Sequence, residues 1–132
     1  MRLRVGLKMV KKVLIVDDEP SVLYTIKHGL EGLDKDYEIM CADSGDKCFD
    51  LLENKQIPDL IILDLLMPSM NGWEVQKKLQ TNSEWRDIPI IFLTAVSDEA
   101  SKRIGNLIGR DYIEKPVKTT ELKKRIDKIL KA

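Results

Sequence analysis

The stretch Val13–Glu19, VLIVDDE, joins four branched apolar residues to three consecutive carboxylates. The apolar run predicts a buried strand, because aliphatic and β-branched side chains suit a sheet interior. Burying charge is costly, and neighbouring carboxylates repel one another. We therefore expect the strand to end where the acidic residues begin, so that these side chains lie at the mouth of a sheet.

Short apolar runs alternate with amphipathic segments along the rest of the chain. Strands are expected in residues 12–17, 37–42, 59–66, 88–95 and 111–116. Helices are expected from Pro20 to Leu33, from a Ser44 cap through Leu52, and over residues 72–80, 98–108 and 119–130. In the fourth helix, Ala100, Ile104, Leu107 and Ile108 share one side. Five strand–helix repeats predict an α/β fold with a parallel sheet and right-handed crossovers.

Length and composition limit the classes of protein to consider. The 132 residues suit one domain, and we assign residues 11–131 to it and expect residues 1–10 to form a disordered extension. Residues 1–12 hold five basic residues and no acid, so the remainder is acidic overall, which argues against binding of duplex DNA. The sequence shows no apolar run of membrane-spanning length and no signal peptide, so we expect no membrane contact and a cytoplasmic location.

Polar side chains converge at one predicted edge of the sheet. Asp17 and Asp18 follow the first strand, Asp64 follows the apolar run of the third, Thr94 ends the fourth, and Lys115 lies just past the fifth. Ligands of such sheets bind at the carboxyl ends of the strands. Clustered carboxylates suit Mg²⁺, and a carboxylate nucleophile beside a lysine and a hydroxyl predicts acyl-phosphate chemistry.

Each of these residues has a simpler explanation when it is taken alone. The two adjacent aspartates could cap a helix, Asp64 could begin an Asx turn, Thr94 could be an ordinary strand residue, and Lys115 could be a surface lysine. Their shared position at the ends of successive strands favours a functional site.

Four motifs resemble the receiver domain of two-component response regulators, in the single-domain form typified by chemotaxis protein Y. They are LIVDDEP (14–20), LIILDLLMPSMNGWE (60–74), IIFLTA (90–95) and DYIEKP (111–116). The resemblance implies a flavodoxin-like (βα)5 sandwich with strand order 2-1-3-4-5. It also implies a signalling module rather than an enzyme, with only self-directed phosphotransfer and autodephosphorylation.

The resemblance assigns a role to each acidic residue. Asp64 would be the phosphoacceptor, taking a phosphoryl group from a histidine kinase or a histidine phosphotransfer protein. Asp18, Asp64 and the backbone carbonyl of Leu66 would bind Mg²⁺ directly, and Asp17 would hold the ion through water. Glu19 matches no ligand, and we interpret it as the residue that precedes the helix.

The resemblance also implies how the phosphoryl group is held and sensed. Lys115 would pair with it, Thr94 would move to bond it, and the backbone N–H groups of Leu66 and Ala95 would complete its cradle. Tyr112 would turn inward as Thr94 withdraws, and this change would control a downstream protein. The Lys115–Pro116 bond corresponds to one that is cis in the family.

The sequence departs from the family pattern between Thr94 and Lys115, which are one residue closer than usual. Counted back from Tyr112, Ile108 falls where a helix-ending glycine is usual, and Gly109 comes one place late. We therefore expect a shortened or re-registered fourth helix. The face formed by this helix, the fifth strand and the fifth helix would be affected, and this is the face that would form a phosphorylation-dependent dimer.

Two other functions were weighed against this one. A phosphotransfer enzyme of the haloacid-dehalogenase type needs an Asp-x-Asp after the first strand, whereas here Asp17 and Asp18 are adjacent. A pseudo-receiver that only binds partners is disfavoured by the intact Asp18, Asp64, Thr94 and Lys115. The partner kinase, the signal, and whether the chain is a whole protein or a fragment stay open.

Overall fold

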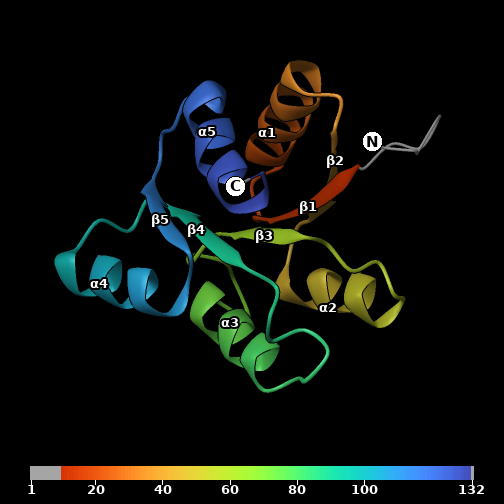
Figure 1. The fold of residues 1–132 in the computed structure, drawn as a ribbon. Helices are drawn as coiled ribbons and strands as arrows, with labels where there is room; N and C mark the ends of the chain where they lie inside the picture. Colours follow the sequence, from red (N-terminus) through yellow and green to blue (C-terminus); the bar gives the residue numbers. More distant parts are fainter. Residues whose placement is uncertain (1–9, 132) are drawn as a thin grey trace.

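Five parallel strands form one sheet at the centre of the part of the chain that the computed structural model describes, residues 10–131 (Figure 1). The strands are β1 (Lys11–Val16), β2 (Tyr37–Ala42), β3 (Leu60–Leu63), β4 (Ile90–Thr94) and β5 (Asp111–Glu114). Their order is β2-β1-β3-β4-β5, which confirms the predicted topology. The expected N-terminal extension lies outside the described residues except for Val10.

Helices cover both faces of this sheet. The helices are α1 (Pro20–Leu33), α2 (Gly45–Glu53), α3 (Gly72–Gln80), α4 (Glu99–Ile108) and α5 (Thr119–Leu130). Helices α1 and α5 lie on one face, and α2, α3 and α4 lie on the other (Figure 1). None of the helices in the described part of the chain is long and apolar enough to cross a membrane.

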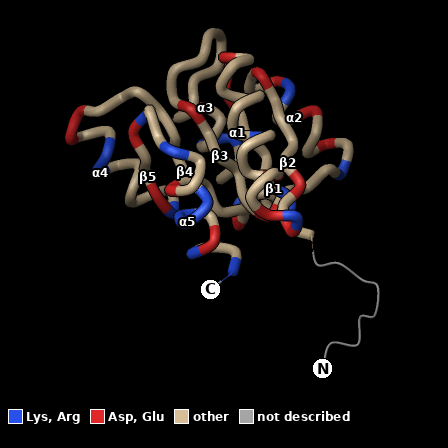
Figure 2. The backbone as a smooth tube through the Cα atoms, turned by 90° about the horizontal axis from the view of Figure 1, so that it is seen from above, with Lys and Arg blue, Asp and Glu red and all other residues tan. Residues whose placement is uncertain are grey.

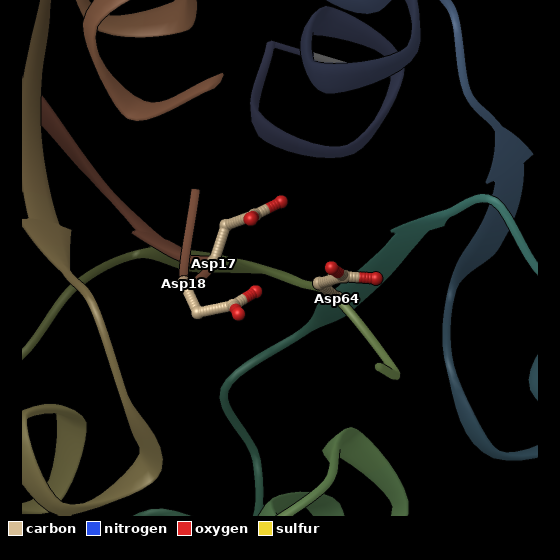
Figure 3. Close-up of side chains that lie close together, drawn as sticks. All are labelled: Asp17, Asp18 and Asp64. Atoms are coloured by element: carbon tan, nitrogen blue, oxygen red, sulfur yellow. The ribbon is translucent and has the colours of Figure 1, made fainter. Parts of the chain in front are cut away.

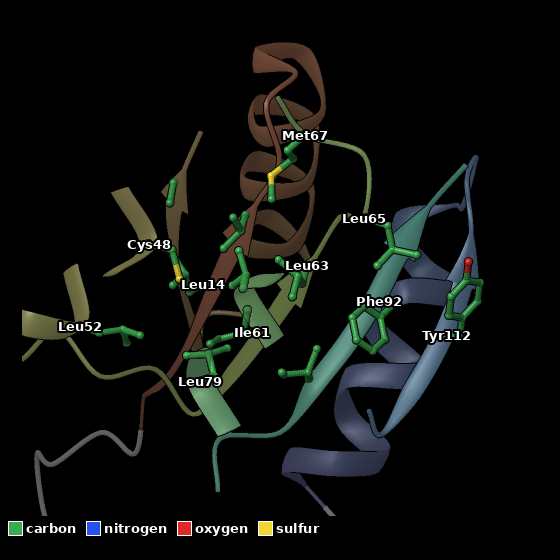
Figure 4. Packing of buried hydrophobic residues seen from close by; sticks show 14 residues of the cluster. Leu14, Cys48, Leu52, Ile61, Leu63, Leu65, Met67, Leu79, Phe92 and Tyr112 are labelled. Atoms are coloured by element: carbon green, nitrogen blue, oxygen red, sulfur yellow. The ribbon is translucent and has the colours of Figure 1, made fainter. Parts of the chain in front are cut away.

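The central strands are apolar at every position because both of their faces are covered. Along β1, Val13 and Ile15 pack toward α1 and α5, while Leu14 and Val16 belong to the cluster under α2, α3 and α4 (Figure 4). All four residues of β3 are buried. This burial fixes the register, since a shift by one residue would exchange the two faces.

Local sequence signals set the starts of α1, α2 and α3. Pro20 occupies the first turn of α1, where its missing N–H costs nothing. The Ser44 side chain accepts a hydrogen bond from the Lys47 N–H at 3.1 Å, as expected for a cap. Asn71 and Glu74 form a reciprocal capping box at the start of α3. The chain therefore leaves β1, β2 and β3 along defined paths.

The connection from α4 to β5 contains Gly109, the glycine that comes one place late in the family pattern. Helix α4 continues to Ile108, and only residues 109–110 separate it from β5. Gly109 caps the helix with φ of −109°, so the left-handed conformation is not used. A Cβ at Gly109 would lie 2.8 Å from a ring carbon of Phe92 and 3.0 Å from the Ile90 carbonyl oxygen. Close packing therefore explains the glycine.

Helices α1 and α5 are joined at their C-terminal ends by an ion-pair network around Asp34. Its carboxylate pairs with Lys131 and lies 3.4 Å from Lys123 Nζ. The hydrogen bonds from Lys131 and from the Asp36 N–H lower the pKa of Asp34 from 3.8 to about 2. A carboxyl whose pKa is lower in the folded state stabilises the fold above its unfolded pKa, and this contribution is lost as the pH falls toward the folded pKa.

We predict that Asp34→Asn lowers the free energy of unfolding by about 1 kcal/mol at pH 7, a value that allows for solvent screening. The difference from the wild type should shrink as the pH falls from about 4 to about 2, because the wild-type carboxyl is then protonated as well. Urea unfolding at several pH values measures this difference in the free energy of unfolding. Glu38→Gln, which replaces an exposed carboxylate, is the control. An equal deficit at pH 7 and pH 2 would contradict the ionic explanation.

Candidate functional site

Three carboxylates converge at the carboxyl edge of the sheet. Val16 and Leu63 are paired in the register of β1 and β3, so the residues that follow them are neighbours. One carboxylate oxygen from each of Asp17, Asp18 and Asp64 lies within 4.8 Å of the others (Figure 3). Asp17 and Asp64 are only 2% and 4% exposed. The predicted acidic cluster is therefore present, and its charges are held close together.

Lys115 reaches this cluster from the end of β5. Its ammonium nitrogen lies 2.7 Å from Asp17 Oδ2 and 3.3 Å from Asp64 Oδ2. Burial lowers the pKa of Lys115, but its hydrogen bond to Asp17 and the charges of both aspartates outweigh burial and raise it. Burial raises the pKa of Asp17, and the bonds from Lys115 and the Glu19 N–H offset this in part. One ammonium group thus offsets only part of the negative charge of the cluster.

Asp18 differs from the other two acids in having no partner for its carboxylate among the described residues. A cluster of three carboxylates with one lysine has an uncompensated charge, which raises the energy of the ionised form. Oxygen ligands close together are what a hard divalent cation requires. The residues present therefore fit a Mg²⁺ site, and Asp18 is the most accessible ligand in it.

The remaining predicted residues lie at the ends of β3, β4 and β5. Thr94 is fully buried at the end of β4, and its hydroxyl oxygen accepts a hydrogen bond from the Val96 N–H at 3.3 Å. The Leu66 N–H donates to Asp64 Oδ1 at 3.3 Å, so it already points at the carboxylate. Ala95 is exposed beside Thr94. The Lys115–Pro116 peptide bond is cis.

The Tyr112 side chain is buried in the protein. Its side chain is 7% exposed, and its hydroxyl donates to the Val96 carbonyl at 2.6 Å. The ring contacts Phe92 across 6.2 Å between centroids. The Tyr112 side chain is therefore buried in the structure, and its movement together with Thr94 stays a prediction.

Gly105 makes room for that ring, and the sequence pattern did not identify it. A Cβ at Gly105 would lie 2.2 Å from Tyr112 Cδ2 and 3.3 Å from Phe92 Cδ2. Gly105 is the one buried residue of α4, whereas Ile104 and Leu107 on the apolar side are 47% and 77% exposed. Hydrophobic periodicity therefore fails for α4, because the helix packs through a glycine onto an aromatic ring.

A second glycine shapes the site itself. A Cβ at Gly72 would lie 2.3 Å from the Asp64 carbonyl oxygen and 2.8 Å from the Leu65 Cα. The Gly72 N–H donates to the Leu65 carbonyl at 2.9 Å. The absence of a side chain therefore lets α3 begin directly against the backbone that presents Asp64. The Asn-Gly pair that ends the MPSMNG loop is the sequence signal for this close turn.

Comparison with known proteins agrees with this geometry. A family model described as the response regulator receiver domain matches residues 13–127. The chain belongs to the response regulator receiver family. Receiver domains are signalling modules of two-component systems, which interact with histidine kinases and with downstream effectors. The sheet order and the acidic edge described above are those of a flavodoxin-like receiver.

Curated relatives of this receiver are longer proteins. It is 36% identical over 124 residues to the alkaline phosphatase synthesis transcriptional regulatory protein PhoP of Bacillus subtilis, covering 93% of the chain and 50% of that protein. It is 35% identical over 130 residues to the probable transcriptional regulator ycf27 of Guillardia theta, covering 98% and 49%. The chain thus spans about half the length of these relatives.

A solved structure covers nearly the same length as the receiver. A putative response regulator from Chloroflexus aurantiacus superposes with a TM-score of 0.82 at 31% identity, covering 93% of this chain and 99% of that one. The chemotaxis protein CheY4 of Vibrio cholerae gives a TM-score of 0.79 at 29% identity, covering 91% and 98%. The likeness therefore extends over almost the whole sheet and its helices.

We predict that Gly105→Ala displaces the Tyr112 ring. Burial, followed by the charges of Asp98 and Glu114, raises the pKa of Tyr112 above its ordinary 10.0. A ring displaced toward solvent should titrate closer to 10.0, and NMR of the tyrosine ring carbons at alkaline pH measures this. Gly32→Ala is the matched control, because its Cβ would have nothing within 4 Å. An unchanged Tyr112 titration in Gly105→Ala would show that the glycine does not hold the ring in place.

Proposed function

We propose that residues 11–131 form a receiver in which Asp64 accepts a phosphoryl group from a phosphohistidine of a histidine kinase or histidine phosphotransfer protein. The single observation that supports this best is the Asp64 carboxylate, which is 4% exposed, faces Asp17 and Asp18, and lies 3.3 Å from the Lys115 ammonium. A buried carboxylate held next to a fixed cation is oriented for attack. Membership of the receiver family supports the same role.

In the proposed step an Asp64 carboxylate oxygen attacks the phosphorus atom. The oxygen–phosphorus bond forms as the phosphorus–nitrogen bond of phosphohistidine breaks, and the electron pair of that bond stays on the imidazole nitrogen. The product is an acyl phosphate on Asp64. Lys115, which contacts Asp64 in the structure, is placed to pair with the transferred phosphoryl oxygens.

The neighbouring backbone and hydroxyl groups have complementary roles in this proposal. The N–H groups of Leu66 and Ala95 would donate to the phosphoryl oxygens, together with the Thr94 hydroxyl. The Leu66 N–H already bonds to Asp64 Oδ1, which supports its place in the cradle. Self-directed phosphorylation from small phosphodonors and autodephosphorylation would use the same groups.

We assign the metal site to Asp18, Asp64 and the Leu66 carbonyl, with Asp17 acting through water. When bound there, Mg²⁺ supplies positive charge that offsets repulsion between the carboxylates and the incoming phosphoryl group. Lys115 alone cannot balance three carboxylates, which supports a second cation in the site. Asp17 keeps Lys115 in position through their 2.7 Å bond.

The output in this proposal passes through Thr94 and Tyr112 to the face formed by α4, β5 and α5. Tyr112 connects the two regions, because its hydroxyl bonds to Val96, whose N–H bonds to the Thr94 hydroxyl oxygen. Exposed Ile104 and Leu107 on α4 give that face an apolar surface. A downstream protein, or a second copy in a phosphorylation-dependent dimer, would bind there.

We predict that the protein becomes phosphorylated on Asp64 when it is incubated with Mg²⁺ and acetyl phosphate. Intact-mass spectrometry at mildly acidic pH should detect the added phosphoryl group, which hydroxylamine should remove because an acyl phosphate is labile. Asp64→Asn removes the nucleophile and should abolish the mass increase, while Asp87→Asn, in an exposed loop, should keep it. Equal phosphorylation of Asp64→Asn and the wild type would disprove the assignment of the acceptor.

Mg²⁺ should also stabilise the fold in the absence of any phosphodonor. A ligand that binds only the folded state contributes about 2.7 kcal/mol at one hundred times its Kd. Thermal unfolding in Mg²⁺ and in excess EDTA should therefore differ for the wild type and much less for Asp18→Ala. The Asp18 carboxylate has no partner among residues 10–131, so the variant should fold normally in EDTA. Melting curves of the wild type that coincide in the two solutions would argue against a metal site.

A further inference from the structure

A second concave surface lies between α2 and α3, and none of its lining residues belongs to the phosphorylation site. Its volume is about 360 Å³. The floor is formed by half-buried apolar side chains, Phe49, Met70 and Trp85. The rings of Phe49 and Trp85 contact one another at 5.7 Å between centroids. We call this surface the α2–α3 groove.

One wall of the α2–α3 groove is acidic. Asp46, Asp50 and Glu53 of α2 line the groove, and all three are exposed. Acidic positions are coloured red along α2 in Figure 2. Within residues 10–131 no ion pair involves any of the three carboxylates. The basic residue in the lining is Lys78, whose ammonium lies 5.8 Å from the Phe49 ring centroid. A negative wall above an aromatic floor suits an occupant with both basic and apolar side chains.

We propose that the α2–α3 groove binds residues 1–9 of the same chain. This segment, MRLRVGLKM, contains Arg2, Arg4 and Lys8 and no acidic residue, and apolar side chains alternate with the two arginines. Alternate residues of an extended peptide are about 6.7 Å apart. Carboxylates three or four residues apart on a helix have Cβ atoms about 5–6 Å apart. The two arginines therefore match the spacing of the acidic wall, while Leu3 and Val5 suit the aromatic floor.

The segment starts close to the end of the groove. The described chain begins at Val10, and the Lys12 N–H donates to Asp59 Oδ2 at 2.8 Å. Asp59 is six residues beyond Glu53, and the link between them folds back, since the Gln56 N–H bonds to the Leu51 carbonyl. Nine extended residues span about 30 Å, which is enough to pass this link and continue along α2. A tethered segment also binds at a high effective concentration.

Deletion of residues 1–9 tests the contact in the otherwise complete chain. The Trp85 indole and Phe49 ring resonances should shift in NMR spectra, and Arg2→Glu, Arg4→Glu and Lys8→Glu together should give the same shifts. Lys35→Glu, Lys118→Glu and Lys124→Glu, all exposed, change the net charge equally and should leave both resonances in place. Addition of 1 M NaCl to the wild type should move the resonances toward their positions in the deleted chain.

A peptide of residues 1–9 added to the deleted chain should return the resonances toward their wild-type positions. Asp46→Lys, Asp50→Lys and Glu53→Lys together in the deleted chain should abolish that effect. A peptide that carries Arg2→Glu, Arg4→Glu and Lys8→Glu should restore the effect with this variant. The deleted chain carries no substitution in the folded domain. The deletion test therefore does not depend on whether the variant with lysines at 46, 50 and 53 folds. Unchanged Trp85 and Phe49 resonances on deletion would overturn the proposal. The proposal would also be overturned if the resonance differences between the wild type and the deleted chain disappeared on dilution. The segment bound in the groove would then come from a second copy of the chain.

Discussion

The bond between the Lys115 ammonium and the Asp17 carboxylate is the interaction on which the functional edge depends. Lys115 follows β5 and Asp17 follows β1, which are separated by β3 and β4 in the sheet. The lysine also contacts Asp64, so one side chain joins the ends of three strands. Removing one partner from such a buried group leaves a charge without compensation, which is strongly destabilising. The ion pairs of Lys115 with Asp17 and Asp64 therefore hold these side chains in position at the edge of the sheet.

The same edge is left with more negative charge than Lys115 can neutralise, and this imbalance connects structure to signalling. Three carboxylates around one ammonium favour an added cation, and in the proposed function the arrangement would change when an anionic phosphoryl group arrives. In that proposal Thr94 and Lys115 would bond the phosphoryl group. The Val96 N–H donates to the Thr94 hydroxyl oxygen, and the Tyr112 hydroxyl donates to the Val96 carbonyl. An electrostatic event at the acidic cluster is thus connected to α4 through two hydrogen bonds and a packed ring.

Helix α4 and the α2–α3 groove show two different uses of aromatic side chains. On α4, a glycine permits the Tyr112 ring to pack beneath the helix, which pushes Ile104 and Leu107 out to the surface. Between α2 and α3, the Phe49 and Trp85 rings stay partly exposed beside a row of acids. The first arrangement belongs to the proposed switch face, and the second to the proposed docking surface. The two lie on the same side of the sheet but share no residues.

The sequence by itself determined the strands, most helix limits and the clustering of Asp17, Asp18 and Asp64. Apolar runs such as LIIL can be stable only between two layers, and Pro20, Ser44 and Asn71 start helices through contacts a few residues away. The acids after β1 and β3 were placed together because parallel strands end at one edge. Only the tertiary structure decided that Lys115 bonds Asp17 more closely than Asp64, that α4 packs through Gly105 instead of its apolar side, and that Phe49 meets Trp85. These features depend on distances between elements far apart in sequence, which local periodicity does not encode.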